Sequence, residues 1–373
     1  MKLLGTGLIP AGSGSGSLTA HGRSAYREQV TSAADARPLV IGHRGASGYR
    51  PEHTASAYEL AFALGADAVE PDVVLSKDGV AVVRHENEIS GTTDVAAHTE
   101  FADRRATKWI DGQETTGWFT EDFTWAELST LKARERLPGV RPASATFDGR
   151  FALLRLTDVL GIVERAGTDA GRALSAVVEL KHAAYFDSIG MSLAEHVGAA
   201  LADAGWADRP EQLVVESFEK SALGALRDRG VAARWIYLLE AAGAPPDLVA
   251  RDGDRARDYA SYLTDDGLAE LAAGVDGISL DKASIMPRDL TNAAHRVSDV
   301  VARAHAAGLS VFTWTLRAEN RFLPRNYRIG RDAGSFGEWE KEFAAVLSSG
   351  VDGVFADQPD LAVRARESVG GAT

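Results

Sequence analysis

The sequence predicts an α/β protein with the (β/α)₈ architecture, the TIM barrel. Apolar, strand-like runs alternate with helical patterns along most of the chain, and eight such runs can be counted. Alternation of strand and helix favours a parallel sheet, and eight units favour a sheet closed into a barrel. In addition, polar residues suited to catalysis stand at the ends of several runs, where barrels of this kind place their active sites.

The elements are expected at defined positions along the chain. The eight strands cover residues 38–43, 68–75, 173–180, 212–218, 233–239, 275–280, 309–316 and 351–356. Helical patterns lie between them over residues 55–64, 193–204, 220–229, 265–273, 293–307 and 336–347. An additional strand over residues 80–85 follows the turn signal Asp78-Gly79 and is expected to form an antiparallel hairpin with the second strand.

The first strand is a short apolar run that begins at Pro38 and presents His43 and Arg44 at its carboxyl end. Pro51 indicates the start of the following helix, and Gly65 ends it. The first βα loop therefore brings an imidazole and a guanidinium to the mouth of the predicted barrel.

The second strand contains two carboxylates, Glu70 and Asp72. Side chains two apart in a strand point to the same face, so these two repel each other unless a cation lies between them. Counting back from the hairpin turn places His85 beside Pro71, which brings a second imidazole to the carboxylate pair. Carboxylate oxygens for a divalent cation, a guanidinium for phosphate and two imidazoles for proton transfer together fit metal-assisted phosphoryl chemistry.

This segment resembles the glycerophosphodiester phosphodiesterase family. The resemblance rests on His43-Arg44-Gly45, on Pro51-Glu52-His53-Thr54, on Glu70-Pro71-Asp72, and on Lys77-Asp78-Gly79 leading to His85. It extends over about residues 38–360 and includes features of the larger, secreted-type bacterial branch. This chain has His53 where the family usually has Asn, and Glu86 where it usually has Asp.

The resemblance implies roles for particular residues. It implies that Glu179 is a third metal ligand. It also implies that Lys181, two residues further on the same strand face, binds phosphate. Without the family context, Lys181 is equally well explained as a strand-end lysine. Trp314 would contact the glycerol, although core packing explains it equally well. The implied site comprises His43, His85 and Arg44 as catalytic residues; Glu70, Asp72 and Glu179 as ligands of Ca²⁺ or Mg²⁺; and Arg44, Glu52, Lys181, Phe218 and Trp314 as substrate contacts.

The implied activity is hydrolysis of a glycerophosphodiester, the small-molecule substrate, to sn-glycerol 3-phosphate and an alcohol. His85 is expected to protonate the leaving alcohol and His43 to act on the attacking oxygen, which belongs either to water or to the glycerol of the substrate. Three alternatives remain open: a phospholipase-D-like activity on lysophospholipid or sphingomyelin, an exohydrolase of glycerol-phosphate cell-wall polymer, and an inactive barrel that serves as a binding module.

Composition bounds the domain organisation and the partners. The chain has 373 residues, of which 45% are hydrophobic and 25% charged, as expected for one globular catalytic domain. The net charge of −13 argues against nucleic acid as a partner, and no apolar run is long enough for membrane insertion. Without cysteine the chain has no thiol chemistry, and the sequence leaves the oligomeric state open.

Three segments are expected to lie outside the regular barrel. Residues 1–37 read as a flexible, Gly/Ser-rich lead-in without a clear signal peptide, so the localisation stays open although the resembled branch is often secreted. Residues 92–149 fit no barrel unit and are expected to form an insertion, whose aromatic side chains line the substrate entrance or form a small core of their own. Residues 241–257 read as a loop, and residues 366–373 as a flexible tail.

Overall fold

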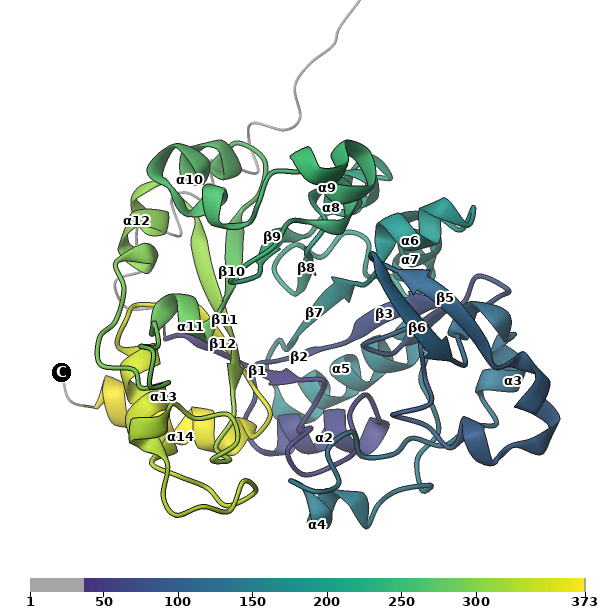
Figure 1. The fold of residues 1–373 in the computed structure, drawn as a ribbon, viewed down its shortest axis with the longest axis horizontal. Helices are drawn as coiled ribbons and strands as arrows, with labels where there is room; N and C mark the ends of the chain where they lie inside the picture. Colours follow the sequence, from purple (N-terminus) through teal and green to yellow (C-terminus); the bar gives the residue numbers. More distant parts are fainter. Residues whose placement is uncertain (1–36, 372–373) are drawn as a thin grey trace, which may run out of the picture. The chain divides into compact units, whose positions relative to one another are not determined.

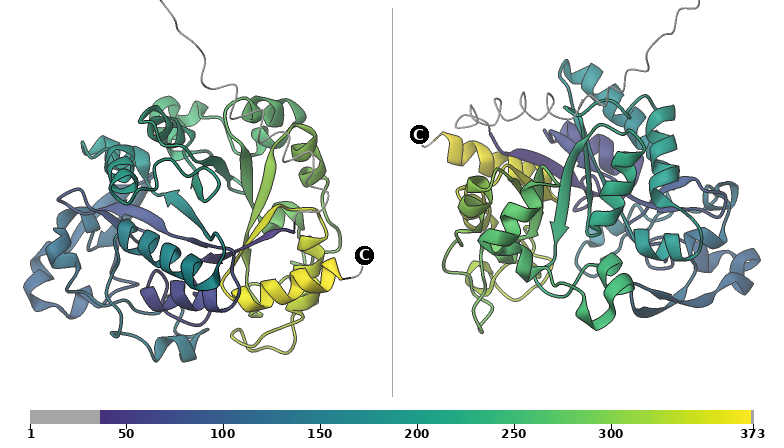
Figure 2. Two further views of the ribbon diagram at one scale, coloured as in Figure 1. Left: turned by 180° about the vertical axis from the view of Figure 1, so that it is seen from behind. Right: turned by 90° about the horizontal axis from the view of Figure 1, so that it is seen from above.

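The computed structural model describes residues 37–371, and they form the predicted (β/α)₈ barrel (Figure 1). The hydrogen-bonded strand order is β2-β1-β12-β11-β10-β9-β8-β7-β3-β4, and a further pairing of β2 with β7 closes the ring. The barrel strands are β1 (Leu39–His43), β2 (Ala68–Glu70), β3 (Asp72–Leu75), β7 (Ser175–Leu180), β8 (Leu213–Ser217), β9 (Arg234–Leu239), β10 (Gly277–Asp281), β11 (Ser310–Leu316) and β12 (Gly353–Ala356). Helices surround this ring of strands (Figure 2).

The second barrel strand is divided into β2 and β3 at Pro71. Proline has no N–H to donate to a strand ladder, so the regular pairing is interrupted there. The Pro71 carbonyl still accepts a hydrogen bond from Glu179 N at 3.0 Å, which keeps the strand against β7. The predicted hairpin is present: β4 (Ala81–Val83) runs antiparallel to β3 with Val73 opposite Val83.

Most predicted helices are present, although their ends differ. The longer helices are α2 (Ala55–Ala63), α5 (Leu156–Ala170), α7 (Leu193–Asp203), α8 (Lys220–Asp228), α10 (Asp265–Ala272), α12 (Val300–Ala306), α13 (Trp339–Leu347) and α14 (Pro359–Gly370). The shorter ones are α3 (Trp125–Leu128), α4 (Pro142–Ala145), α6 (Ala183–Ser188), α9 (Pro246–Asp252) and α11 (Lys282–Ile285). Short 3₁₀ helices are η2 (Val95–Ala97), η3 (Thr99–Arg104), η4 (Thr120–Asp122), η5 (Gly253–Arg255), η6 (Ala260–Leu263) and η7 (Arg325–Tyr327).

Three expectations about local structure were wrong. The chain is helical to Gly370 in α14, where a flexible tail from residue 366 was predicted, because Arg366 is buried and donates hydrogen bonds to Asp67 Oδ2 and the Pro38 carbonyl. Residues 241–257 contain α9, which starts on a proline at its first turn. Helix α12 begins at Val300, seven residues after the predicted start.

Helix α5 was missed although its signal is in the sequence. Its buried residues Leu156, Val159, Leu160 and Val163 follow the spacing of one helical face. The predicted lead-in falls almost wholly on residues 1–36, which lie outside the described part of the chain.

A layer of apolar side chains fills the barrel interior below the site. It consists of Ile41, Ala68, Val177, Val214, Ile236, Phe312 and Phe355, each from a different strand. Because strand side chains alternate between faces, residues two positions further along also point inward. Those positions hold His43, Glu70, Glu179, Glu216, Leu238, Trp314 and Asp357. The apolar layer therefore supports a layer made mostly of functional side chains at the carboxyl ends.

The segment at residues 92–149 lies beside β3 and α6 and contains the hairpin of β5 (Ala106–Ile110) and β6 (Gln113–Gly117) (Figure 1). Most of its aromatic residues form a core: Trp118 donates through Nε1 to the Phe101 carbonyl, and Phe119 is fully buried. Trp109, with 66% exposure, lies outside this core.

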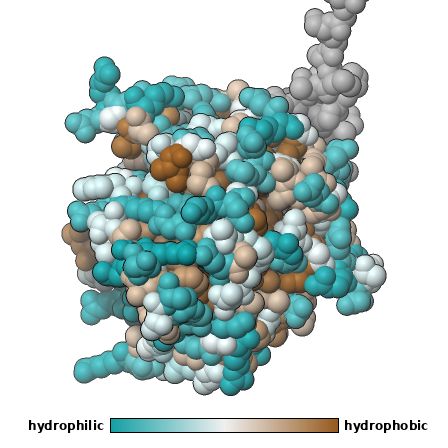
Figure 3. Space-filling model, turned by 90° about the vertical axis from the view of Figure 1, so that its right-hand side faces the viewer, coloured by the Kyte–Doolittle hydropathy of each residue, from teal (hydrophilic) through white to brown (hydrophobic). Residues whose placement is uncertain are grey.

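The side of the molecule that carries β5 and β6 is mostly hydrophilic, with hydrophobic residues exposed singly or in small groups (Figure 3). Among residues 37–371, every helix is too short or too polar to cross a bilayer.

Candidate active site

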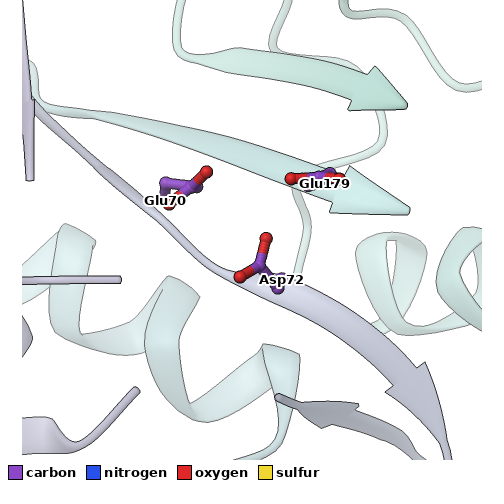
Figure 4. A group of neighbouring side chains, drawn as sticks. All are labelled: Glu70, Asp72 and Glu179. Carbon is purple, nitrogen blue, oxygen red and sulfur yellow. The ribbon is translucent and has the colours of Figure 1, made fainter. Parts of the chain in front are cut away.

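Three buried carboxylates meet at the mouth of the barrel. Glu70 ends β2 opposite His43 of β1, Asp72 begins β3, and Glu179 lies opposite Asp72 on β7. Each offers an oxygen within 4.8 Å of the other two, and the three side chains point toward one another (Figure 4). The predicted convergence of the three carboxylates is therefore present.

The pKa values of two of the three carboxyl groups are raised, as expected for buried carboxylates that lie beside one another without a cation. Burial and the neighbouring carboxylates Asp72 and Glu179 raise the pKa of Glu70 well above its usual range. Burial also raises the pKa of Glu179 to about 8. Asp72 is different: despite burial, Lys181 and His53 hold its pKa well below the usual range.

The residues present fit a hard divalent cation. Asp72 Oδ1 is buried and accepts no hydrogen bond from any described residue. All three groups offer carboxylate oxygens, the ligands that Ca²⁺ and Mg²⁺ take in proteins. A cation bound among them would keep all three ionised and remove the mutual repulsion.

Glu216 is a fourth buried carboxylate, which the sequence reasoning missed. It lies on β8 directly opposite Glu179 in register, and neither of its oxygens has a hydrogen-bond partner among the described residues. Burial, together with Glu70 and Glu179, raises its pKa well above the usual range, which favours the neutral acid over the carboxylate in the cation-free protein. Its signal was the alternation along β8, because Val214 faces the barrel interior and Glu216 is two residues further on.

Two cationic side chains approach the carboxylates. Lys181 Nζ lies 2.6 Å from Glu179 Oε1 and 3.5 Å from Asp72 Oδ1. Arg44 Nε lies 3.4 Å from Asp72 Oδ2, and its Nη1 donates to Glu52 Oε2 at 3.2 Å. Both residues are therefore held in place before a substrate anion arrives.

The backbone at Arg44 adopts the left-handed conformation, with φ of 58°. This conformation is unfavourable for residues other than glycine and is kept only where the surroundings stabilise it. Here it directs the Arg44 amide to Glu70 Oε2, at 3.0 Å. The same turn therefore fixes a metal-ligand candidate through its backbone and supplies a phosphate-binding candidate through its side chain.

His43 lies at the end of β1 between two carboxylates. Its Nδ1 is 2.6 Å from Asp357 Oδ1, and its Nε2 is 3.8 Å from Glu70 Oε2. Despite burial, Arg317 and Arg141 hold the pKa of Asp357 well below its usual range, so this carboxylate only accepts. Nδ1 of His43 therefore carries the proton. Burial and the charge of Arg44 lower the pKa of His43 to about 4, which leaves Nε2 free to accept a proton.

His85 follows β4 and is paired with its neighbour, Nδ1 to Glu86 Oε1 at 2.5 Å. Burial and the charges of Arg44 and Lys181 lower its pKa to about 3. His85 is among the groups that lower the pKa of Asp72, which agrees with the predicted placement of the second imidazole near the carboxylates. Each of the two histidines thus has Nδ1 on a carboxylate and Nε2 available.

His53, the departure from the family pattern, has a structural explanation. Its φ is 57°, a left-handed value that Asn and His tolerate better than most residues. The fully buried ring connects two groups, with Nε2 at 2.9 Å from Asp72 Oδ2 and Nδ1 at 2.7 Å from Tyr58 Oη. Because burial lowers the pKa of His53, the neutral ring donates from Nε2 to Asp72 and accepts at Nδ1.

Two aromatic residues form a wall beside Lys181. The rings of Phe218 and Trp314 meet edge to face with centroids 5.8 Å apart, and Lys181 Nζ lies 5.6 Å from the Phe218 centroid. Trp314 Nε1 is a buried donor without a partner among the described residues. An apolar face with a free donor suits a glycerol moiety, which has carbon atoms and hydroxyl groups.

Arg136, Arg141 and Asp357 contact the histidines or their partners, and the sequence reasoning missed all three. Asp357 could have been found, because it lies two residues beyond the inward-facing Phe355. The two arginines belong to an irregular segment without periodicity, so no comparable signal existed for them.

Comparison with known proteins agrees with this geometry. Residues 43–361 match the model of the glycerophosphoryl diester phosphodiesterase family. The chain belongs to this family. The predicted enzyme class, a phosphoric diester hydrolase, is thereby confirmed.

Individual relatives are similar over most of their length. Glycerophosphodiester phosphodiesterase GDPD6 of Arabidopsis thaliana is 30% identical over 335 residues, which are 86% of this chain and 84% of that protein. The glycerophosphodiester phosphodiesterase of Treponema pallidum is 25% identical over 345 residues, 87% of this chain and 91% of that protein.

Solved structures share the fold. A crystal structure from Silicibacter pomeroyi has a TM-score of 0.61 at 23% identity and covers 90% of this chain and 95% of its own. A phosphodiesterase of Oleispira antarctica, solved with its product sn-glycerol-3-phosphate, has a TM-score of 0.55 at 20% identity over 89% of this chain and 97% of its own.

Proposed function

We propose that the enzyme hydrolyses glycerophosphodiesters to sn-glycerol 3-phosphate and an alcohol, with Glu70, Asp72 and Glu179 holding Ca²⁺ or Mg²⁺. The observation that carries the proposal is the arrangement around the three carboxylates. Two neutral imidazoles and two cationic side chains, from three separate places in the sequence, converge on one buried acidic cluster. Membership of the family agrees with this assignment.

Phosphate binding falls to Arg44 and Lys181. Both contact Asp72, so a phosphodiester that reaches the carboxylates meets both positive charges at once. A cation held by Glu70, Asp72 and Glu179 would supply Lewis-acid stabilisation of the charge that develops on the phosphate oxygens. The glycerol half then lies against Trp314 and Phe218, and the alcohol half extends outward.

Proton transfer is divided between the two histidines. His43 accepts the proton of the attacking hydroxyl at Nε2 as the new P–O bond forms, and its Nδ1–H stays on Asp357. His85 donates a proton to the leaving alcohol oxygen as the old P–O bond breaks. The positive charges of Arg44 and Lys181 contribute to the low pKa of His85, and an anionic substrate compensates them, so we expect that pKa to rise when substrate binds.

The proposal is tested with a panel of substrates under Ca²⁺, Mg²⁺ or EDTA. The panel contains glycerophosphocholine, glycerophosphoethanolamine, lysophosphatidylcholine and a glycerol-phosphate oligomer. We expect glycerol 3-phosphate to be released from at least one glycerophosphodiester, with activity lost in EDTA and restored by one of the two cations. Full activity in EDTA would exclude the metal role.

Two outcomes would replace the proposal. A preference for lysophosphatidylcholine indicates the phospholipase-D-like activity, and a preference for the oligomer indicates the polymer exohydrolase. A His305→Ala variant is the matched control. His305 pairs with Asp352 at 2.9 Å just before β12 begins, at the opposite end of the barrel, and its loss should leave every rate unchanged.

A further inference from the structure

The insertion at residues 92–149 sends two arginines into the barrel mouth. Arg136 and Arg141 lie just before and at the start of α4, and neither belongs to a barrel strand. With His43, Arg44 and Glu52 they line a cavity of only about 20 Å³, which has room for about one water molecule. On this side, the insertion is packed directly against the catalytic residues.

Arg136 connects the partners of His85 and Arg44. Its Nη1 and Nη2 donate to the two oxygens of Glu86 at 2.9 and 2.6 Å, and Glu86 is the carboxylate that accepts from His85. The same guanidinium donates to the two oxygens of Glu52, from Nε at 2.7 Å and from Nη2 at 2.6 Å. Glu52 in turn accepts from Arg44.

Arg141 stands in the same relation to His43. Its Nη2 donates to Asp357 Oδ2 at 2.5 Å, while the other oxygen of Asp357 accepts from His43. Two further bonds fix Arg141, from Nε to Glu319 Oε1 at 2.7 Å and from Nη1 to the Ser47 carbonyl at 3.0 Å. Arg317 also binds Asp357, since its Nε donates a hydrogen bond to Oδ2 at 2.7 Å.

We propose that Arg136 and Arg141 are positioning residues, each holding the carboxylate that orients one of the two histidines. This inference rests on the proposed two-histidine mechanism. A carboxylate on Nδ1 orients the imidazole and directs Nε2 at the substrate, but only if the carboxylate itself has one fixed rotamer. The bidentate ion pair with Arg136 fixes the rotamer of Glu86, and the buried ion pair with Arg141 fixes the rotamer of Asp357.

The inference changes the expected role of the insertion. Sequence reasoning made it a wall of the substrate entrance or a small satellite core. The arginine contacts make it a part of the catalytic apparatus, since each histidine is completed by one insertion residue. The insertion then sets the rate for every substrate, in addition to any effect on the choice of alcohol.

The test uses Arg136→Met and Arg141→Met in the full-length enzyme, with R136K and R141K as conservative variants. Arg134→Met is the matched control, because Arg134 is two residues from Arg136, is 54% exposed and contacts only Asp148 among its described ion pairs, at 3.6 Å. Rates are measured on glycerophosphocholine and on a p-nitrophenyl glycerophosphodiester, whose leaving group needs little protonation. Melting temperature and cation affinity are measured on the same samples.

We expect R136M to lose about 10- to 100-fold in kcat on glycerophosphocholine and much less on the nitrophenyl substrate, because it acts through the general acid. R141M should lose about tenfold on both substrates, since it acts through the base and Arg317 retains part of its function. Lysine variants should recover part of the rate. R134M should match the parent enzyme, and cation affinity should be unchanged throughout.

Double variants separate positioning from a general loss of structure. If Arg136 acts on proton transfer through His85, adding R136M to His85→Ala should cause no further loss in kcat, and any effect through Glu52 and Arg44 should appear in KM. Likewise, adding R141M to His43→Ala should cause no further loss in kcat. The inference is overturned if R136M and R141M behave like R134M, if R136M loses equally on both substrates, or if the losses add to those of the histidine variants. Full activity of both single histidine variants would instead remove the proposed mechanism itself.

Discussion

Removal of the cation should make the stability of the enzyme fall as pH rises, and Glu179 should account for a measurable part of the slope. The pKa of Glu179 is about 8 in the folded, cation-free protein and 4.5 in the unfolded chain. Between these values the folded state binds the proton more tightly, so raising the pH favours unfolding. The contribution of Glu179 to stability is fully present below its pKa in the unfolded chain, and it is lost as pH rises through about 8, its pKa in the folded protein.

The magnitude follows from linkage. One proton that is bound in the folded state and released in the unfolded state changes the free energy of unfolding by about 1.4 kcal/mol per pH unit. Between pH 5.5 and 7.5 the parent enzyme should therefore lose about 2–3 kcal/mol relative to Glu179→Gln, which has no proton to release there. The buried histidines titrate in both proteins, so their contribution cancels in the difference.

The assay is urea unfolding in EDTA at several pH values for the parent, Glu179→Gln and Glu195→Gln. Glu195 is a surface residue of α7, 60% exposed in its pair with Arg229, so E195Q should follow the parent. Calcium or magnesium should stabilise the parent increasingly as pH rises to about 8, because binding displaces the proton. Parallel pH slopes for the parent and E179Q would refute a protonated Glu179 and the reasoning built on it.

The remaining predictions concern the histidines and the aromatic wall. His43→Ala and His85→Ala should each lower kcat by about 10²–10⁴ while the circular dichroism spectrum stays unchanged. The loss of kcat in His85→Ala should be smallest for substrates that release p-nitrophenol, the better leaving group. Identical leaving-group dependence in the two variants would contradict the division of roles. Trp314→Ala should raise KM by a similar factor for every glycerophosphodiester, measured by steady-state kinetics, whereas a changed ranking of alcohols would place Trp314 on the other half of the substrate. His53→Ala should lower the free energy of unfolding by about 2 kcal/mol or more, because the buried side chains of Asp72 and Tyr58 each lose a hydrogen-bond partner. Asn tolerates the left-handed backbone at this position, so His53→Asn should lose less stability than His53→Ala. Equal losses in the two variants would contradict this explanation.

The sequence by itself determined the barrel and the part of the site that follows from strand periodicity. Strand periodicity placed Glu70 and Asp72 on one face, and the first apolar run presented His43 at its carboxyl end, whereas Glu179 was assigned through the resemblance to the family. The carboxyl ends of parallel strands meet at one edge, so the sequence alone predicts that these residues lie together. The helices were predicted less accurately than the strands. The amphipathic face of α5 was overlooked, and α14 extends into the predicted tail.

Only the tertiary structure decided how the histidines are held. Asp357 lies 314 residues from His43 in the sequence, and only the closure of the barrel between β1 and β12 brings them together. Arg136 and Arg141 look like ordinary surface charges of an irregular segment, because their partners Glu86 and Asp357 are set by how that segment folds back over the mouth. Periodicity describes what one strand presents, whereas a contact between a loop and a distant strand depends on the whole chain.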